Sequence, residues 1–262
     1  MTVIDAHPDC GALKQPTSRR LQDEDCQAMV TGFQFRAFPS DPMAYIDFIS
    51  PLHKKTARDY VARVTEFPKA EAATIAKRFD KDYWDGDRRV GYGGMRYDGR
   101  WRVVAENMVE HYGLKAGDRI LDIGCGKAFL LYEFTQVVPG IEIAGIDISE
   151  YGVENAKEET REFLKVGNAI ELPYEDNAFD FVLSINTFHN LHCYDLDKAL
   201  REMNRVAKRD KYLVVESYRN ESEKANLLYW QLTCESFCTP EEWEWWFRQT
   251  GYDGDHSFIY FE

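Results

Sequence analysis

The segment Arg119-Ile-Leu-Asp-Ile-Gly-Cys-Gly-Lys-Ala128 decides the fold of this chain. An apolar strand runs directly into a glycine turn, and a helical pattern over 127–137 follows at once. Glycines at such a turn let a small ligand approach the backbone closely, and the helix after the turn presents its N-terminus to that ligand. The segment therefore predicts a site for a nucleotide-like cofactor.

The residues after the turn disfavour two phosphate-binding alternatives. A dinucleotide-binding turn has a third glycine where this chain has Phe129, and a phosphate-cradling loop needs a hydroxyl where Ala128 stands. Asp122 precedes the turn, and Asp147 ends the next apolar segment. One carboxylate suits a cationic group and the other a pair of ribose hydroxyls. A cofactor with a ribose, a positive charge and no phosphate is S-adenosylmethionine.

Strands and helices alternate around this unit. Capping signals support the pattern, since Ser149 can begin one helix and Thr239-Pro-Glu-Glu is a capping box that begins another. Alternation of apolar, β-branched strands with helices predicts an α/β fold with a doubly wound, mostly parallel, Rossmann-like sheet. The expected strands are 119–123, 141–147, 163–166, 179–185, 212–217 and 257–261, with helices at 103–111, 127–137, 149–160 and 196–206.

The chain before the glycine turn has a different character. Helical patterns within 42–79 predict an N-terminal cap, while 80–102 interleaves glycine, arginine and aromatic residues, so no regular element is expected there. The predicted organisation is an extension, cap and loop over 1–102, followed by a cofactor domain over 103–262. That domain carries an aromatic helical insertion at 221–250, and no element is assigned to 1–40.

Composition limits the partners and the location. The formal net charge of −13 argues against a nucleic-acid-binding surface, which needs a basic face. No apolar run reaches a membrane-spanning length, no signal peptide is recognisable, and the six cysteines show no CxxC pair. We expect a cytoplasmic protein with reduced thiols, a monomer or homodimer, that binds a small-molecule acceptor and neither nucleic acid nor membrane. No metal site is predicted.

The stretch from about Asp118 to Ser217 resembles the class I S-adenosylmethionine-dependent methyltransferases, close to the ubiquinone and menaquinone biosynthesis group. The motifs that carry the resemblance are Leu121-Asp-Ile-Gly-Cys-Gly-Lys-Ala, Gly145-Ile-Asp-Ile-Ser, Val166-Gly-Asn-Ala, Leu172-Pro-Tyr-Glu-Asp-Asn-Ala-Phe-Asp-Phe-Val and Glu202-Met-Asn-Arg-Val-Ala. The resemblance implies a seven-stranded-type sheet that ends in an antiparallel hairpin. Here the strand at 257–261 is plain, and its partner near Tyr252 is short.

The resemblance also implies where the cofactor binds. Asp122, Gly124 and Gly126 would surround the methionine part, and Asp147 would hold the ribose. Asn168 stands where the family often has an aspartate facing the adenine amine, and its amide oxygen can still accept a hydrogen bond. The remaining predicted cofactor contacts are Cys125, Ile148 against the adenine face, Ala169, Ser184 and Tyr92.

Candidate residues for the transfer step come from two segments. In the resembled family, the loop after the fourth strand borders the transferred methyl group, and here it carries Asn186, His189 and His192. A histidine there could orient the acceptor or take its proton. Glu216 and Tyr218, after the fifth strand, are weaker candidates.

The second segment is the loop at 88–102. Its arginines could clamp an anionic substrate, since the guanidinium fork suits carboxylate and phosphate, and its aromatic residues could close over the cofactor. Tyr97 is a further catalytic candidate. The residues concerned are Arg88, Arg89, Arg96 and Arg100 with Tyr92, Tyr97 and Trp101.

The predicted function is S-adenosylmethionine-dependent O- or N-methylation of a small, polar or anionic metabolite. Two alternatives stay open. One is a nucleic-acid or protein methyltransferase, which the acidic charge disfavours. The other is a non-catalytic module that binds the same cofactor as a sensor or structural ligand.

Overall fold

The computed structural model describes residues 43–53 and 58–262, which belong to one compact unit spanning 41–262. Expectations about residues 1–40, and the part of the predicted cap at 54–57, lie outside the described residues. The domain boundary expected at residue 102 stays a prediction.

A six-stranded sheet, all parallel, forms the centre of the described fold. Its strand order, β3-β2-β1-β4-β5-β6, changes direction between β1 and β4, so the chain winds outward on both sides of that point. The predicted doubly wound, Rossmann-like sheet is confirmed. The strands are β1 Arg119–Ile123, β2 Glu142–Asp147, β3 Leu164–Val166, β4 Phe179–Ile185, β5 Ala207–Glu216 and β6 Asp255–Ile259.

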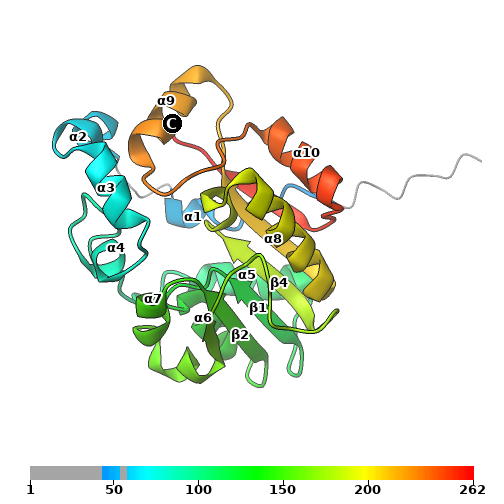
Figure 1. Cartoon of the computed structure of the whole chain (residues 1–262). Coiled ribbons are helices and arrows are strands. Elements are labelled where there is room, and N and C mark those ends of the chain that lie inside the picture. Colours follow the sequence, from blue (N-terminus) through cyan, green and yellow to red (C-terminus); the bar gives the residue numbers. More distant parts are fainter. Residues whose placement is uncertain (1–42, 54–57) are drawn as a thin grey trace, which may run out of the picture. The chain divides into compact units, whose positions relative to one another are not determined.

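Helices cover both faces of the sheet (Figure 1). Helices α5 (Arg102–Tyr112) and α6 (Phe129–Val137) pack on the face that holds Ile120, and α8 (Cys193–Val206) and α10 (Pro240–Thr250) pack on the opposite face. Alternate residues of each strand contribute to the hydrophobic cores on the two faces of the sheet, because successive side chains point to opposite faces. A sheet covered in this way leaves its carboxyl edge as the place for a ligand.

Local signals set most helix ends where the sequence predicts them. Gly113 follows α5, and the Thr239 hydroxyl and Glu242 carboxylate form the reciprocal capping box of α10. The helix expected over 149–160 is instead two pieces, α7 (Glu150–Glu154) and the 3₁₀ helix η1 (Glu158–Phe163). The chain turns between them so that the Lys157 N–H donates to the Lys127 carbonyl at 3.1 Å.

The cap before the sheet consists of short helices: α1 (Ser50–His53), α2 (Tyr60–Thr65), α3 (Lys69–Ala76) and α4 (Lys81–Asp85). In Figure 1, α2 to α4 form a column that runs from α9 (Glu221–Trp230) at one end to α7 at the other. The expectation of no regular element over 80–102 is wrong at α4. The Asp80 side chain caps this helix by accepting from the Asp82 N–H at 3.0 Å.

The edge of the sheet differs from the hairpin implied by the resemblance. Strand β6 runs parallel to β5, and only residues 251–254 separate it from α10, too few to form an antiparallel partner. The outer side of β6 is occupied instead by the segment Ala44–Ile46. The Ile46 N–H donates to the His256 carbonyl at 2.9 Å, and the His256 N–H donates to the Ala44 carbonyl at 3.0 Å.

None of the helices in residues 43–53 and 58–262 has the length and apolar character that a membrane crossing requires.

Candidate functional site

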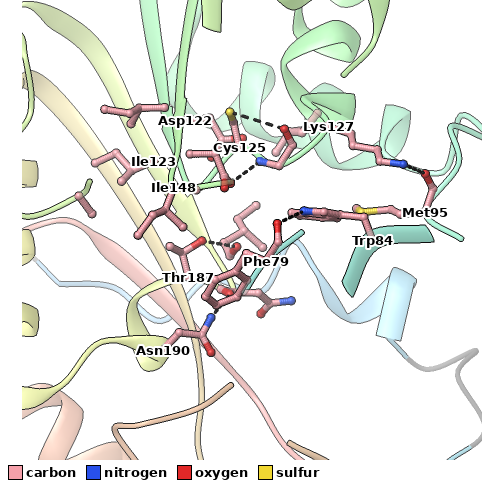
Figure 2. Close-up of a pocket in the computed structure, with 18 of the residues that line it drawn as sticks. Phe79, Trp84, Met95, Asp122, Ile123, Cys125, Lys127, Ile148, Thr187 and Asn190 are labelled. Carbon is pink, nitrogen blue, oxygen red and sulfur yellow. Dashed lines mark hydrogen bonds between the residues drawn. The ribbon is translucent and has the colours of Figure 1, made fainter. Parts of the chain in front are cut away.

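A cavity opens at the carboxyl ends of β1, β2 and β4, where the winding of the sheet changes direction (Figure 2). We call it the cofactor cavity. The glycine turn and the ends of these strands form one wall, and residues of the N-terminal cap form the opposite wall. The residues of this opposite wall come from the cap and from the loop that follows it: Phe79, Tyr83, Trp84, Tyr92 and Met95.

The glycine turn is held tightly between two neighbouring side chains. Gly124 has a φ of +82°, and a Cβ at this position would lie 1.9 Å from the Thr187 hydroxyl oxygen. Gly126 has a φ of +52°, and its Cβ would lie 2.7 Å from the Trp84 ring. Both positions therefore require glycine, for backbone conformation and for space.

Two buried carboxylates line the cavity. Asp147 accepts from the Gly126 N–H at 2.7 Å and from the Ser149 N–H at 2.8 Å, which fixes its orientation. Asp122 is 6% exposed and accepts no hydrogen bond from the described residues. Burial, followed by the neighbouring charge of Asp147, raises the pKa of Asp122 to about 8.

These carboxylates fit the chemistry of S-adenosylmethionine. No basic side chain in the described chain forms an ion pair with Asp122 or Asp147, so a cationic ligand would relieve the cost of ionising them. Lys127 is buried close by, but its ammonium is committed to Asp85. Asp147 also retains acceptor capacity for ribose hydroxyls beyond its two backbone bonds.

A clamp joins the cap to the cofactor cavity. The Lys127 ammonium donates to both oxygens of Asp85 at 2.7 Å and to the Met95 carbonyl at 3.0 Å, as Figure 2 shows in part. The Trp84 indole N–H donates to the Ser149 hydroxyl at 2.7 Å. Sequence reasoning missed this clamp. The available signal was an acidic residue after two aromatics, Tyr83-Trp84-Asp85, upstream of a glycine turn that carries a lysine.

The structure brings most of the predicted cofactor contacts together. Tyr92 closes the cap side, where its ring stacks on Trp84 with centroids 5.4 Å apart. Ser184 lies behind the wall, outside the lining, and donates its hydroxyl to the Ile123 carbonyl at 2.7 Å. The predicted residues that line the cavity are Asp122, Gly124, Cys125, Gly126, Asp147, Ile148, Asn168, Ala169 and Tyr92.

The predicted catalytic residues are spread over different environments. Asn186 lines the cavity with a φ of +59°, and its buried amide oxygen has no hydrogen-bond partner within residues 43–53 and 58–262. His189 is buried behind the wall. His192 is exposed, with Nδ1 3.8 Å from Glu235, and Tyr97 donates to the Glu133 carboxylate at 2.7 Å. Neither His192 nor Tyr97 belongs to the lining of the cofactor cavity or of the second cavity described next.

A second cavity, of about 450 Å³, adjoins the first. We call it the arginine cavity, because its lining includes Arg58, Arg63, Arg88, Arg96 and Arg100. The two cavities share Tyr83, Tyr92, Met95, Trp101, Phe129 and Asn186. Three of the guanidinium groups surround the Trp230 ring, those of Arg58, Arg63 and Arg88 at 5.7, 5.2 and 5.4 Å from its centroid.

The arginine cavity has an excess of positive charge. Among the described residues, only Arg100 of these five arginines forms an ion pair, with Asp98. Burial and the neighbouring charge of Arg88 lower the pKa of Arg63. The acidic residues in the lining are Asp98 and Glu216. The predicted clamp residue Arg89 lies outside the lining and pairs with Asp87 at 2.6 Å.

A family model described as a methyltransferase domain matches residues 114–251, just over half of the chain. The chain therefore belongs to this methyltransferase family. The resemblance drawn from the motifs is confirmed, and with it S-adenosylmethionine as the cofactor of the fold.

Individual relatives are similar over part of the chain. A demethylmenaquinone methyltransferase from Staphylococcus aureus (strain JH9) is 37% identical over 112 residues, which cover 41% of this chain and 46% of the relative. The chain thus matches about half the length of the curated relatives. The YcgJ protein of Bacillus subtilis superposes with a TM-score of 0.46 at 24% identity, covering 56% of this chain and 66% of that one. The PH0226 protein of Pyrococcus horikoshii OT3 superposes with a TM-score of 0.42 at 21% identity, covering 56% of this chain and 66% of that one.

Proposed function

We propose that this protein transfers a methyl group from S-adenosylmethionine to an oxygen or nitrogen atom of a small anionic metabolite. The observation that carries the proposal is the arginine cavity, which adjoins the cofactor cavity and has more positive than negative groups in its lining. A cluster of cationic side chains without carboxylate partners is stabilised by a bound anion. Arg63, Arg88 and Arg96 would bind the anionic group of the acceptor.

The shared wall supports a direct transfer between the two cavities. Tyr92, Phe129 and Asn186 line both, so an acceptor in the arginine cavity would face the cofactor across these side chains. The unpartnered amide oxygen of Asn186 is available to a donor group of the acceptor or the cofactor. It would orient the reacting groups, which is the main contribution of a protein to such a displacement.

The cap would exclude water from the reaction. When bound, S-adenosylmethionine supplies an activated methyl group on its sulfonium sulfur. The Lys127–Asp85 pair and the Trp84–Ser149 hydrogen bond hold aromatic side chains over the cofactor cavity. Burial beneath these rings would strengthen the attraction between Asp122 and the positive charge of the cofactor.

The lining of the arginine cavity favours an anionic acceptor over two others. The curated relatives are named for demethylmenaquinone, whose ring and isoprenoid chain are apolar, whereas this cavity carries five arginines. A nucleic acid is disfavoured by the net charge of −13. A non-catalytic module would have the same cofactor cavity, and only a measurement of methyl transfer distinguishes such a module from an enzyme.

The proposal is tested with S-adenosylmethionine labelled with tritium in its methyl group. The labelled cofactor is incubated with separate pools of phosphate esters, carboxylates and neutral quinols, and transferred label is counted after anion exchange. We expect label in an anionic pool. Arg96→Ala should then raise the KM for that acceptor about tenfold, because a charge-assisted hydrogen bond is lost, without changing cofactor affinity.

Arg89→Ala is the matched control, since Arg89 is an exposed arginine of the same loop that lies outside the cavity. Label in the neutral pool alone, or equal effects of the two substitutions, would contradict an anionic acceptor. Tight cofactor binding without transfer to any pool would favour the non-catalytic module.

We also propose a cytoplasmic location and a monomer or homodimer. The location is supported by the cysteines of the described chain, Cys125, Cys193, Cys234 and Cys238, which are all free thiols.

A further inference from the structure

Glu216 stands at the end of β5 and is one of the residues that line the arginine cavity. The residue is 5% exposed and its backbone is fixed on both sides: its N–H donates to His189 Nδ1 at 3.3 Å, and its carbonyl accepts from the Trp243 indole N–H at 3.0 Å. The Gln231 amide donates to one carboxyl oxygen, Oε1. The other oxygen, Oε2, is buried and has no hydrogen-bond partner in the described part of the chain.

His189 supports this carboxyl group from behind. Its Nδ1 accepts a hydrogen bond, so the proton of the neutral ring lies on Nε2, which is 3.4 Å from Glu216 Oε2. Burial lowers the pKa of His189 to about 3, and the ring therefore stays neutral at physiological pH. The Nε2–H group lies beside Oε2 without a hydrogen bond between them, so its dipole acts on the carboxylate through proximity alone.

Both protonation states of Glu216 are accessible near neutral pH. Burial raises the pKa of its carboxyl group to about 8, and the charge of Arg58 acts in the opposite direction. Besides His189 and Arg58, the titratable groups that face Glu216 from the surrounding elements are Tyr83 of α4, Tyr92 of the loop and the Cys234 thiol. Among these, Arg58 carries the only full charge at neutral pH, so it is the group that favours the carboxylate.

We propose that Glu216 is the proton acceptor of the methyl transfer, with His189 as a positioning residue that binds its backbone N–H and lies beside its carboxyl group. The inference rests on the proposed function and names the residue that completes it. As the hydroxyl or neutral amine of the acceptor reacts, a lone pair of its oxygen or nitrogen bonds to the methyl carbon while the carbon–sulfur bond breaks towards sulfur. The proton left on that oxygen or nitrogen passes to the carboxylate of Glu216 and is later released to solvent through the arginine cavity.

This placement narrows the class of acceptor. The anionic group would be bound by arginines such as Arg96 on the loop side of the cavity, and the proton-bearing nucleophile would lie at Glu216 on the sheet side. The substrate class is therefore a metabolite with an anion at one end and a hydroxyl or amine at the other. A thioether acceptor has no proton to lose and would not need this carboxylate.

The test compares wild type, Glu216→Gln and Glu216→Asp by transfer of tritiated methyl to the anionic pool between pH 6 and 10. In the wild type, kcat should rise with pH and level off above about pH 8, because the ionised carboxyl group is the active form. Glu216→Gln should lose about 100-fold or more in kcat and show no such rise, since general-base catalysis contributes about 10²–10⁴-fold. Glu216→Asp should restore part of the rate and of the pH dependence.

His189→Leu tests the positioning role. Loss of the Nε2–H dipole should move the rising limb of the wild-type profile to higher pH, whereas a purely structural role would lower the yield of folded protein without moving the limb. Affinity for S-adenosylhomocysteine, measured by calorimetry, should be unchanged in all variants.

The outcomes separate the two claims. If Glu216→Gln keeps the wild-type rate and pH profile, the inference is wrong and the proposed function stands. If the wild type transfers label to no anionic pool, the proposed function is wrong and the inference falls with it.

Discussion

The two adjoining cavities differ in charge and in how the chain builds them. The cofactor cavity carries two buried carboxylates, Asp122 and Asp147, on neighbouring strands of the sheet. The arginine cavity has cationic groups from the cap and the loop, and three of them surround Trp230 of α9. The difference teaches that one fold can place a cavity with buried carboxylates and a cavity with excess positive charge side by side.

This contrast also explains what the sequence could predict. The cofactor cavity is mostly local: Asp122, Gly124 and Gly126 lie within five consecutive residues, and with Asp147 at the end of the next apolar segment they predict a ribose-containing cation. The parallel sheet could also be predicted, because the alternation of apolar strands and helices is visible along the sequence. The loop arginines were recognised by composition, but Arg58 and Arg63 were missed, because only the tertiary packing brings them to Trp230.

Other differences arise from packing as well. Tyr97 was expected at the transfer site, yet it turns to the buried Glu133, which also accepts from Arg102 at 2.6 Å. Strand β6 runs parallel to β5 because the chain between them crosses back through α9 and α10, and residues 251–254 are too few to add an antiparallel strand before β6. Nothing in the local sequence reports such long-range constraints.

One substitution breaks the link between the cap and the cofactor cavity and should affect both stability and cofactor affinity. Lys127→Met removes the cation that pairs with Asp85 and donates to Met95. We expect the free energy of unfolding to fall by about 2 kcal/mol, less than for a fully buried pair because Tyr151 still donates to Asp85. Urea denaturation measures it, and cofactor affinity should weaken as well.

Lys198→Met is the control for this experiment. Lys198 is exposed and pairs with Asp195 at 3.2 Å, and exposed pairs contribute about 0–1 kcal/mol. Equal losses in the two variants would show that the Lys127–Asp85 clamp does not hold the cap.

Each cavity holds one carboxyl group that should make the stability of the protein depend on pH. The pKa of one carboxyl group in each cavity, Asp122 and Glu216, is about 8 in the folded protein, above the ordinary values of 3.8 and 4.5. The stability that each protonated group contributes is complete below about pH 4 and is lost as the pH rises through 8. Urea midpoints of the unliganded protein should therefore decrease over this range.

Asp122→Asn and Glu216→Gln should each remove part of this decrease, on the order of a few kcal/mol at pH 9. S-adenosylmethionine should suppress only the decrease in stability that comes from Asp122, because the positive charge of the cofactor enters the cofactor cavity. If the cofactor suppresses both parts equally, or if neither substitution alters the slope, the separation of the two cavities by charge is refuted.

The smallest effect is expected at two residues that line neither cavity. His192→Ala should leave methyl transfer within about twofold of wild type, as exposed substitutions away from a site usually do. Tyr97→Phe should cost about 1 kcal/mol of stability, one hydrogen bond to Glu133, with a similarly small change in rate. A tenfold loss of kcat in either variant would contradict this prediction and show that the residue takes part in methyl transfer.

The central claim is that the arginine cavity binds an anion beside an occupied cofactor cavity. The most direct measurement is a calorimetric titration of inorganic pyrophosphate into protein saturated with S-adenosylhomocysteine, repeated with Arg96→Ala and Arg89→Ala. We predict saturable binding that weakens about tenfold in Arg96→Ala and is unchanged in Arg89→Ala, with no displacement of the cofactor product. Absence of binding, equal weakening in both variants, or displacement of S-adenosylhomocysteine would contradict the claim.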